Sequence, residues 1–278
     1  MLSLVLAVLC STAIALVMRV STDRVQSNVG LLVMNYLTCF VIAVAFTGVG
    51  SLFTTEQGRL AALGLGGAQG VLYLAAFLLL QLNIRKNGVV LSAIFQRLGL
   101  LVPMVVAVFL FGEIPETMQI IGFCVAVLAI VLINLEKEQT VMQFKLGLLL
   151  ILLTGGTADV MAKLYEEWGN PALAPQFLLH TFGVALVLSV VLLLWKKERA
   201  GLKELLYGAA VGVPNYFCAK FLLASLETVP AVIVYPTFSV ATILLVTLAG
   251  VVLFKEKLGK RQWAAVAIIL LALVLLNL

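Results

Sequence analysis

The chain contains two copies of one long segment. Residues 88–135 recur without a gap as residues 231–278, at an offset of 143 residues. The residues that coincide include Val89 and Val232, Phe111 and Phe254, Gln119 and Gln262 and, outside this stretch, Tyr73 and Tyr216. A unit of about half the chain is much longer than a solenoid repeat, whose period is roughly 20–50 residues. The sequence therefore predicts a fused pair of related halves.

The composition indicates that both halves lie in a lipid bilayer. Hydrophobic residues make up 63% of the chain and charged residues 11%, and the mean hydropathy is +1.17. In soluble domains roughly a quarter of the residues are charged. The four cysteines lie in apolar runs with no metal or redox spacing, so we expect reduced core residues. No nucleophile, phosphate-loop or metal motif is present, so we expect neither an enzyme nor a cofactor.

Ten apolar segments are close to the ~20 residues that cross a bilayer. The first lacks a preceding basic region and a cleavage site, so we interpret it as a span and not as a signal peptide. We expect an all-α integral membrane fold, with a first five-helix repeat over residues 1–135, a linker over 136–143 and a second five-helix repeat over 144–278. The expected spans are 2–18, 28–47, 60–82, 87–111, 116–135, 145–165, 173–195, 203–226, 229–253 and 261–278.

Five spans per repeat is an odd number, so the second repeat must enter the membrane from the opposite side. This predicts two inverted-topology repeats with a solute site at their interface. Two halves of opposite orientation can exchange conformations, which opens one site first to one face and then to the other. The duplication therefore favours transport by alternating access.

The distribution of Lys and Arg predicts the orientation of the spans. Basic residues gather in the odd-to-even connections, whereas the other side receives only Arg59. Examples are Arg24, Arg85, Lys197 and Lys203. Because cytoplasmic loops carry the excess of Lys and Arg, both termini are predicted to be extracytoplasmic. The net charge of +5 is then explained by topology and anionic lipid headgroups, and we expect no nucleic-acid partner.

The passage Leu110–Glu113, followed by Gln119, and its echo Leu253–Glu256 with Gln262 resemble the drug/metabolite transporter superfamily, EamA-type branch. The resemblance covers the whole chain. It implies a ten-helix secondary carrier of small organic solutes in a prokaryotic inner membrane, often an exporter of amino acids, amines or related metabolites. One departure is Lys255, where the family prefers Gly. Another is the predicted orientation, since many relatives keep their termini in the cytoplasm.

Glu113 and Glu256 occupy the junctions between the fourth and fifth spans of the two repeats. A carboxylate near the start of a helix is stabilised by the helix dipole. We interpret both residues as structural, and binding of a coupling ion is the alternative.

Three charged residues are expected inside the bilayer. Each charge there costs about 2.5–3.5 kcal/mol, so Arg97, Asp159 and Lys220 are predicted to face protein or a wet cavity. Their net positive charge suits a solute that carries a carboxylate or phosphate. The competing interpretation is that Asp159 pairs with Lys163 or with Arg97. Lys163 is also placed to snorkel to the interface.

Polar side chains at helical spacing mark the predicted cavity. The fourth span carries a stripe that includes Ser92 and Gln96, and the same offset leads to a stripe in the ninth span. We predict a cavity lined by Gln69, Tyr73, Ser92, Gln96, Arg97, Asp159, Tyr216, Lys220, Tyr235, Ser239 and Thr242. Interhelical hydrogen bonding is the alternative for the stripes. Gly66, Gly70, Gly208 and Gly212 are expected to permit close helix packing.

These observations predict a secondary transporter of a small organic metabolite, with a small-molecule solute and membrane lipid as its partners. The chain is expected to act as a monomer or homodimer in the prokaryotic cytoplasmic membrane. Two other functions stay open. A flippase for an amphiphilic or lipid-linked substrate would need a lateral opening between helices, and a membrane scaffold would show no solute flux.

Overall fold

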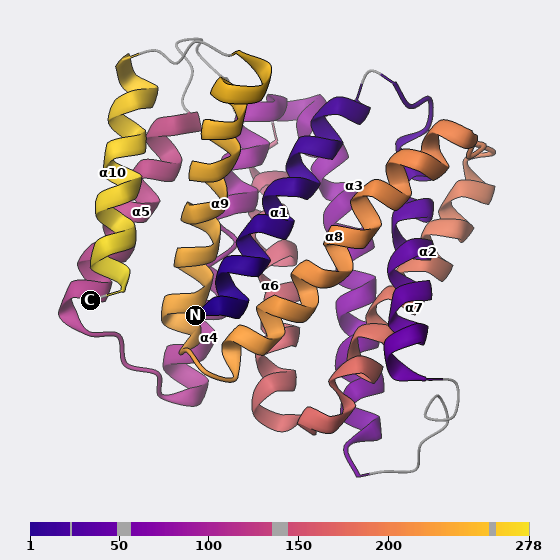
Figure 1. The fold of residues 1–278 in the computed structure, drawn as a ribbon, viewed down its shortest axis with the longest axis horizontal. Coiled ribbons are helices and arrows are strands. Elements are labelled where there is room, and N and C mark those ends of the chain that lie inside the picture. The colour runs from indigo at the N-terminus through magenta and orange to yellow at the C-terminus, as the bar shows by residue number, and fades with distance from the viewer. Residues whose placement is uncertain (23, 49–56, 135–143, 256–259, 278) are drawn as a thin grey trace. The chain divides into compact units, whose positions relative to one another are not determined.

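The computed structural model describes residues 1–22, 24–48, 57–134, 144–255 and 260–277. Glu256 and the predicted linker 136–143 lie outside these residues. The regular structure of the described residues is entirely helical, with ten α-helices and one short 3₁₀ helix (Figure 1). The expected all-α fold with ten helices is confirmed. The elements are α1 (Leu2–Ser21), α2 (Asn28–Thr47), α3 (Arg59–Leu98), α4 (Leu101–Phe111), α5 (Thr117–Asn134), α6 (Lys145–Trp168), η2 (Pro171–Leu173), α7 (Ala174–Trp195), α8 (Leu202–Leu226), α9 (Ala231–Phe254) and α10 (Lys260–Leu276).

The boundary between the third and fourth helices differs from the expectation. The sequence predicts a connection at residues 83–86, but α3 continues through it to Leu98 and the interruption lies at residues 99–100. Residues 83–86 contain neither Gly nor Pro, so nothing there ends a helix. Pro103 has no backbone N–H to donate to the carbonyl of Gly99, which removes one helical hydrogen bond at the observed interruption.

The described helices include eight segments that are long and apolar enough to cross a membrane. Two of them divide the α3–α4 region into residues 59–87 and 92–111. Two shorter apolar helices span Thr117–Leu132 and Trp263–Leu276. The chain is therefore a multi-pass membrane protein.

The chain forms two compact units. The first unit comprises residues 75–160 and 228–278, and the second comprises residues 2–74 and 161–227. Each unit contains helices from both predicted repeats, so the compact units do not coincide with the repeats. The repeat boundaries stay a prediction from the sequence.

In the second unit, α8 packs against α1 and α2, and α2 also packs against α7. Glycines allow the backbones to approach closely. A Cβ atom on Gly208 would lie 2.4 Å from the Cβ of Met34, and one on Gly70 would lie 2.4 Å from the carbonyl oxygen of Thr181 in α7. The packing role expected for these glycines follows from such contacts.

Two connections of the second unit are joined by a buried carboxylate. Glu204, in the first turn of α8, accepts hydrogen bonds from the backbone N–H groups of Gln26 at 2.7 Å and Ser27 at 3.3 Å. Its other oxygen accepts from the N–H of Gly201 at 2.9 Å. Ser27 in turn caps α2, because its side chain accepts from the N–H of Gly30. The α1–α2 connection is thus held to the start of α8.

In the first unit, α5 and α10 lie side by side, and α9 packs against α4, α5 and α10 (Figure 1). The connection after α4 ends in a left-handed residue, Gly112 (φ 68°), whose N–H donates to the carbonyl of Ala107. The connection after α9 ends in the same way at Lys255 (φ 55°), whose N–H donates to the carbonyl of Gly250. The two donors, Gly112 and Lys255, are 143 residues apart, and so are the two acceptors, Ala107 and Gly250. The same helix ending therefore occurs twice, at the repeat offset.

Candidate functional site

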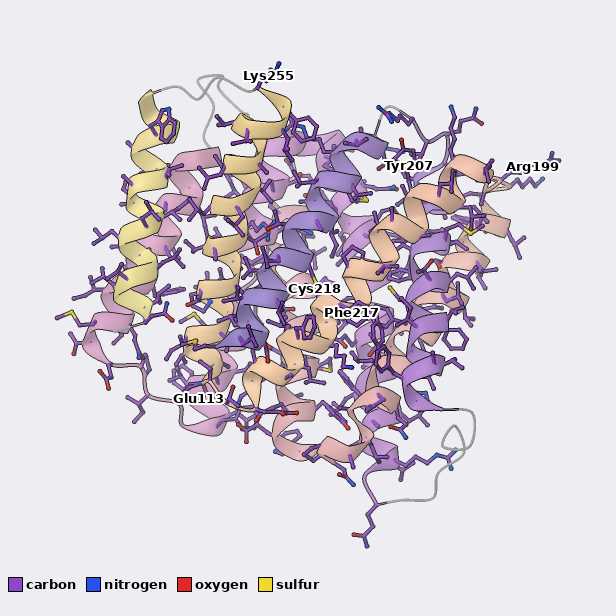
Figure 2. The ribbon with its side chains drawn as sticks, in the orientation of Figure 1. Glu113, Arg199, Tyr207, Phe217, Cys218 and Lys255 are labelled. Atoms are coloured by element: carbon purple, nitrogen blue, oxygen red, sulfur yellow. The ribbon has the colours of Figure 1, made fainter. Side chains whose placement is uncertain are left out.

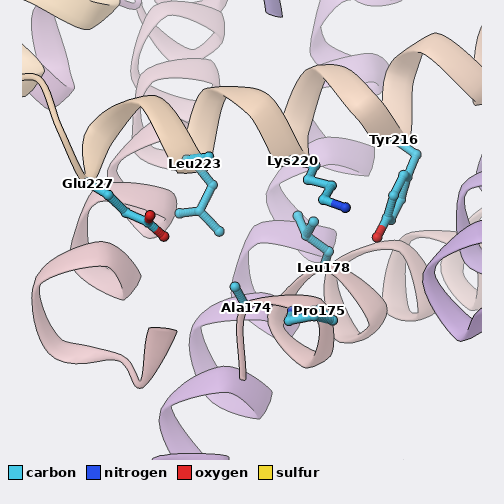
Figure 3. A pocket seen from close by; sticks show the side chains of 8 residues that line it. Ala174, Pro175, Leu178, Tyr216, Lys220, Leu223 and Glu227 are labelled. Carbon is cyan, nitrogen blue, oxygen red and sulfur yellow. The ribbon is translucent and has the colours of Figure 1, made fainter. Parts of the chain in front are cut away.

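A pocket of about 230 Å³ lies between α7 and α8 within the second unit (Figure 3). Its walls are mostly apolar, and its polar side chains come from α8 and the residue that follows it. The lining residues are Ala174, Pro175, Leu178, Tyr216, Lys220, Leu223, Ala224 and Glu227. Two of the residues predicted from the sequence, Tyr216 and Lys220, therefore share one pocket.

Lys220 is held by an aromatic ring. Its Nζ atom lies 3.8 Å from the ring centroid of Phe46 in α2. The Phe46 ring stacks on Tyr216 at a centroid distance of 5.7 Å. A cation above an aromatic face is stabilised by the ring quadrupole. Within the described residues Lys220 forms no ion pair, so its charge is available on the side of the pocket.

Tyr216 fixes one end of the pocket. Its side chain is buried and packs on Phe182 of α7, at a centroid distance of 6.0 Å, and on Phe217 at 5.5 Å. Phe182 also contacts Tyr36 and Tyr73. This aromatic cluster joins α2, α3, α7 and α8, and Tyr216 belongs both to the cluster and to the pocket lining.

Glu227 lies at the other end of the pocket, just after α8. It also lines a smaller adjoining hollow with Tyr165, Glu166 and Pro171. Lys163 forms ion pairs with Glu166 at 2.7 Å and Glu167 at 2.6 Å. The buried charge of Lys163 is therefore balanced by its own helix, whereas Glu227 forms no ion pair within the described residues.

Gln69 and Tyr73, which are also predicted from the sequence, belong to the second unit but do not line the pocket. Gln69 is buried, and its Oε1 accepts a hydrogen bond from Thr181 Oγ1 at 3.1 Å. This hydrogen bond joins α3 to α7 and is of the interhelical kind that was considered as the alternative for the stripes of the fourth and ninth spans. Asn215 makes a similar bond from α8 to Asn35 of α2 at 3.1 Å.

The remaining predicted residues belong to the first unit. Tyr235 is buried, and its hydroxyl donates to the backbone carbonyl of Asp159 at 2.8 Å. Arg97 and Asp159 interact electrostatically, in line with the pairing considered as an alternative. Ser92, Ser239 and Thr242 are buried, and Gln96 is exposed. The Oγ1 atom of Thr242 has no hydrogen-bond partner in the structure as described.

That all eleven residues line one cavity stays a prediction. Sequence reasoning missed Leu178, Leu223 and Glu227. Glu227 was assigned to the connection after the eighth span, although its spacing of seven residues from Lys220 places both on one helical face. Among the described residues there is no group of three His, Cys, Asp or Glu side chains that could hold a metal ion.

Known proteins resemble this chain in sequence and in fold. The model of the EamA-like transporter family matches residues 145–278. An uncharacterized protein from Haemophilus influenzae is 24% identical over 275 residues, which cover 95% of this chain and 93% of that protein. A protein of known crystal structure shares the fold, with a TM-score of 0.74, 16% identity, and coverage of 99% of this chain and 94% of that chain.

The family match confirms the resemblance to this family, and the matched residues include the passage around Lys255. It indicates a membrane transporter of the drug/metabolite type, and a transporter family does not imply enzymatic chemistry. Residues 145–278 of the chain are therefore similar to the EamA-like transporter family.

Proposed function

We propose that the chain is a secondary transporter that binds a small organic solute in the pocket between α7 and α8 and carries it across the cytoplasmic membrane by alternating access. The observation that supports this most directly is Lys220. Lys220 belongs to the candidate membrane span Leu202–Leu226, and its ammonium group lies in a mostly apolar pocket without a carboxylate partner among the described residues.

An unpaired charge in this position is costly. Insertion of a Lys at the centre of a membrane helix costs about 2.5–3.5 kcal/mol, and Lys220 lies six residues before the end of its span, so this range is an upper bound for it. Charged residues in such spans mark solute pathways. The contact with Phe46 offsets only part of this cost, about 0.5–2 kcal/mol. A solute that carries negative charge would supply the missing interaction. The pocket thus binds the anionic group of the solute at Lys220.

The internal duplication supports alternating access. Inverted repeats related by an axis in the membrane plane allow one site to face either side. The excess of Lys and Arg in the odd-to-even connections supports extracytoplasmic termini. The family resemblance favours export, and we propose the remaining predicted polar residues as further parts of the solute pathway.

The test is solute flux in proteoliposomes made from the purified chain. We expect uptake of at least one organic solute above protein-free liposomes, and we expect Lys220→Met to reduce this flux about tenfold or more, because interactions with charged groups contribute roughly 1.5–3 kcal/mol. Lys203→Met is the matched control, since it removes an exposed lysine from the opposite end of α8. A screen in which no solute moves faster than in protein-free liposomes would contradict the proposal and favour a scaffold.

A further inference from the structure

The pocket between α7 and α8 carries opposite charges at its two ends. Lys220 and Glu227 are seven residues apart, two helical turns, so their Cα atoms lie about 10 Å apart along the axis. Both line the pocket, with Leu223 and Ala224 between them. In Figure 3 the amino group of Lys220 is directed toward Tyr216 and away from Glu227. The positive and negative groups therefore occupy opposite ends of the pocket.

Neither charge is neutralised by a described side chain. Lys220 contacts the face of Phe46, and Glu227 has no ion pair in the part of the chain that the structure covers. Lys163, another lysine of the second unit, forms ion pairs with two carboxylates one turn further along its own helix. The buried Lys163 thus has carboxylate partners, whereas the half-buried Lys220 has none among the described residues. Lys220 is half-buried and Glu227 is exposed, and both charges are accessible to a ligand in the pocket.

The space between the two charges is apolar. The α7 side of the pocket consists of Ala174, Pro175 and Leu178, and the α8 side contributes Leu223. A polar group in the middle of a ligand would lose its hydrogen bonds to water here without replacement, which costs roughly 1–3 kcal/mol. The body of the ligand must therefore be apolar.

The Tyr216 hydroxyl lies at the Lys220 end and forms no hydrogen bond with the described residues. A tyrosine hydroxyl can donate to a carboxylate, and an ammonium group cannot accept from it. The Lys220 end is therefore suited to a carboxylate and the Glu227 end to an ammonium group.

We infer that the pocket takes a zwitterion whose carboxylate and ammonium groups lie at opposite ends of an apolar body, as in an ω-amino acid. This inference rests on the proposed transport function for the role of the ligand as cargo. An α-amino acid carries both charges on one carbon atom and can satisfy only one end of the pocket. Separation of the charges is therefore the property that the site recognises.

The test compares two isomers of one formula, ω-aminooctanoate and α-aminooctanoate, by thermal shift and equilibrium binding to the detergent-solubilised chain. We expect the ω-isomer to bind about tenfold or more tightly, because it alone forms both ion pairs. Octanoate and octylamine, which each carry one of the two charges, should bind as weakly as the α-isomer. Equal binding of the two isomers, or binding of neither, would overturn the inference.

Substitutions assign the two ends. Lys220→Met and Glu227→Gln should each lower the affinity for the ω-isomer about tenfold and leave the affinity for the α-isomer within about twofold, whereas Lys203→Met and Glu116→Gln should change neither. If Lys220→Met does not fold, the comparison of isomers on the unsubstituted chain decides alone. Flux of other solutes without binding of the ω-isomer would refute this inference and leave the proposed transport function standing.

Discussion

Residues in a left-handed conformation show how one repeat position can be occupied by two different side chains. Gly112 and Lys255 end α4 and α9 with the same backbone geometry, at φ 68° and φ 55°. Glycine adopts this conformation without steric cost, whereas a side chain is strained by roughly 1 kcal/mol. The second repeat therefore retains the turn although its residue is unfavourable.

We predict opposite effects for substitutions at these two helix ends. Gly112→Ala should lower the free energy of unfolding by about 1 kcal/mol, and Lys255→Gly should raise it by about 0.5 kcal/mol, since the added glycine also increases the entropy of the unfolded chain. Thermal unfolding in detergent measures both. Gly64→Ala is the control, because a Cβ atom there meets nothing within 4 Å. A destabilised Lys255→Gly would contradict the prediction.

Sequence reasoning identified Lys220 and Tyr216 because a charge in an apolar span and a repeated tyrosine are visible without a structure. It missed Glu227, since the residue follows the helix and a sequence does not show which neighbouring helix faces it. The partners of Lys163 were also missed. Glu166 and Glu167 lie three and four residues further along α6, a spacing that predicts ion pairs, but Asp159 on the preceding turn offered an equally spaced partner.

Helix packing in the second unit depends on glycine positions that the sequence had marked. On α3, a Cβ atom on Gly66 would lie 2.5 Å from the carbonyl oxygen of Phe177. The next residue, Gly67, has only the Cγ2 atom of Val184 nearby, at 3.9 Å. Two neighbouring glycines of one helix therefore differ in whether they accept a methyl group.

We predict that Gly66→Ala and Gly70→Ala each destabilise the chain by about 1–3 kcal/mol, because α3 and α7 must separate. Gly67→Ala should leave the melting temperature unchanged or raise it, since alanine favours helix formation by about 1 kcal/mol. The melting temperatures of the three purified variants provide the measurement. Equal destabilisation of all three would show that the α3–α7 contact is not tight.

Glu113 stabilises a helix other than the one that follows it. Its Oε2 atom accepts a hydrogen bond from the backbone N–H of Val232, in the first turn of α9, at 3.1 Å. The residue before α9 is Pro230, which provides no side-chain cap. Figure 2 shows Glu113 and Lys255 near opposite ends of α9. The structural interpretation of Glu113 thus has a specific contact, although the sequence suggested the start of α5.

We predict that Glu113→Ala lowers the free energy of unfolding by about 1 kcal/mol, the typical cost of a lost helix cap. The solute flux of this variant should keep the pH dependence of the unsubstituted chain. Glu116→Ala is the matched control, because Glu116 is exposed and its side chain has no such contact with α9. A loss of proton- or sodium-driven flux in Glu113→Ala, with stability unchanged, would instead favour the coupling-ion interpretation.

The boundary between α3 and α4 was the helix boundary that the sequence predicted least well. The Arg and Lys at residues 85 and 86 suggested a loop, but these residue types are compatible with a helix and their side chains are exposed. The observed interruption depends on Gly99 and Pro103, which lie inside the predicted span 87–111. Helix existence was therefore predicted well, and one boundary was not.

The whole molecule offers a direct test of the inverted topology. Arg24 and Glu167 are exposed and are separated by the repeat offset, so they are equivalent positions of the two repeats. In a chain whose four cysteines are replaced, we predict that a membrane-impermeant maleimide labels Glu167→Cys on intact cells. Arg24→Cys should be labelled only after permeabilisation. Labelling of both from the same side would contradict the inverted repeats.

The duplication is an observation on the sequence itself, where the offset is constant over long stretches. The division into compact units could not be predicted from the sequence. They are set by which faces pack together, and α2 packs against α7 and α8 while α5 packs against α10. A repeat in a sequence shows which segments are alike and does not show which segments touch.

These pairings bear on what a single copy could do alone. A polypeptide that stopped at residue 135 would present the surface of α5 that now meets α10 and the surface of α2 that now meets α8, each without a match. To bury these two helix surfaces, it would need a second copy of the same chain in the opposite membrane orientation. Under the inverted topology predicted from the sequence, an ancestor of half this length is expected to have worked as an antiparallel homodimer, which a gene fusion would then have made permanent.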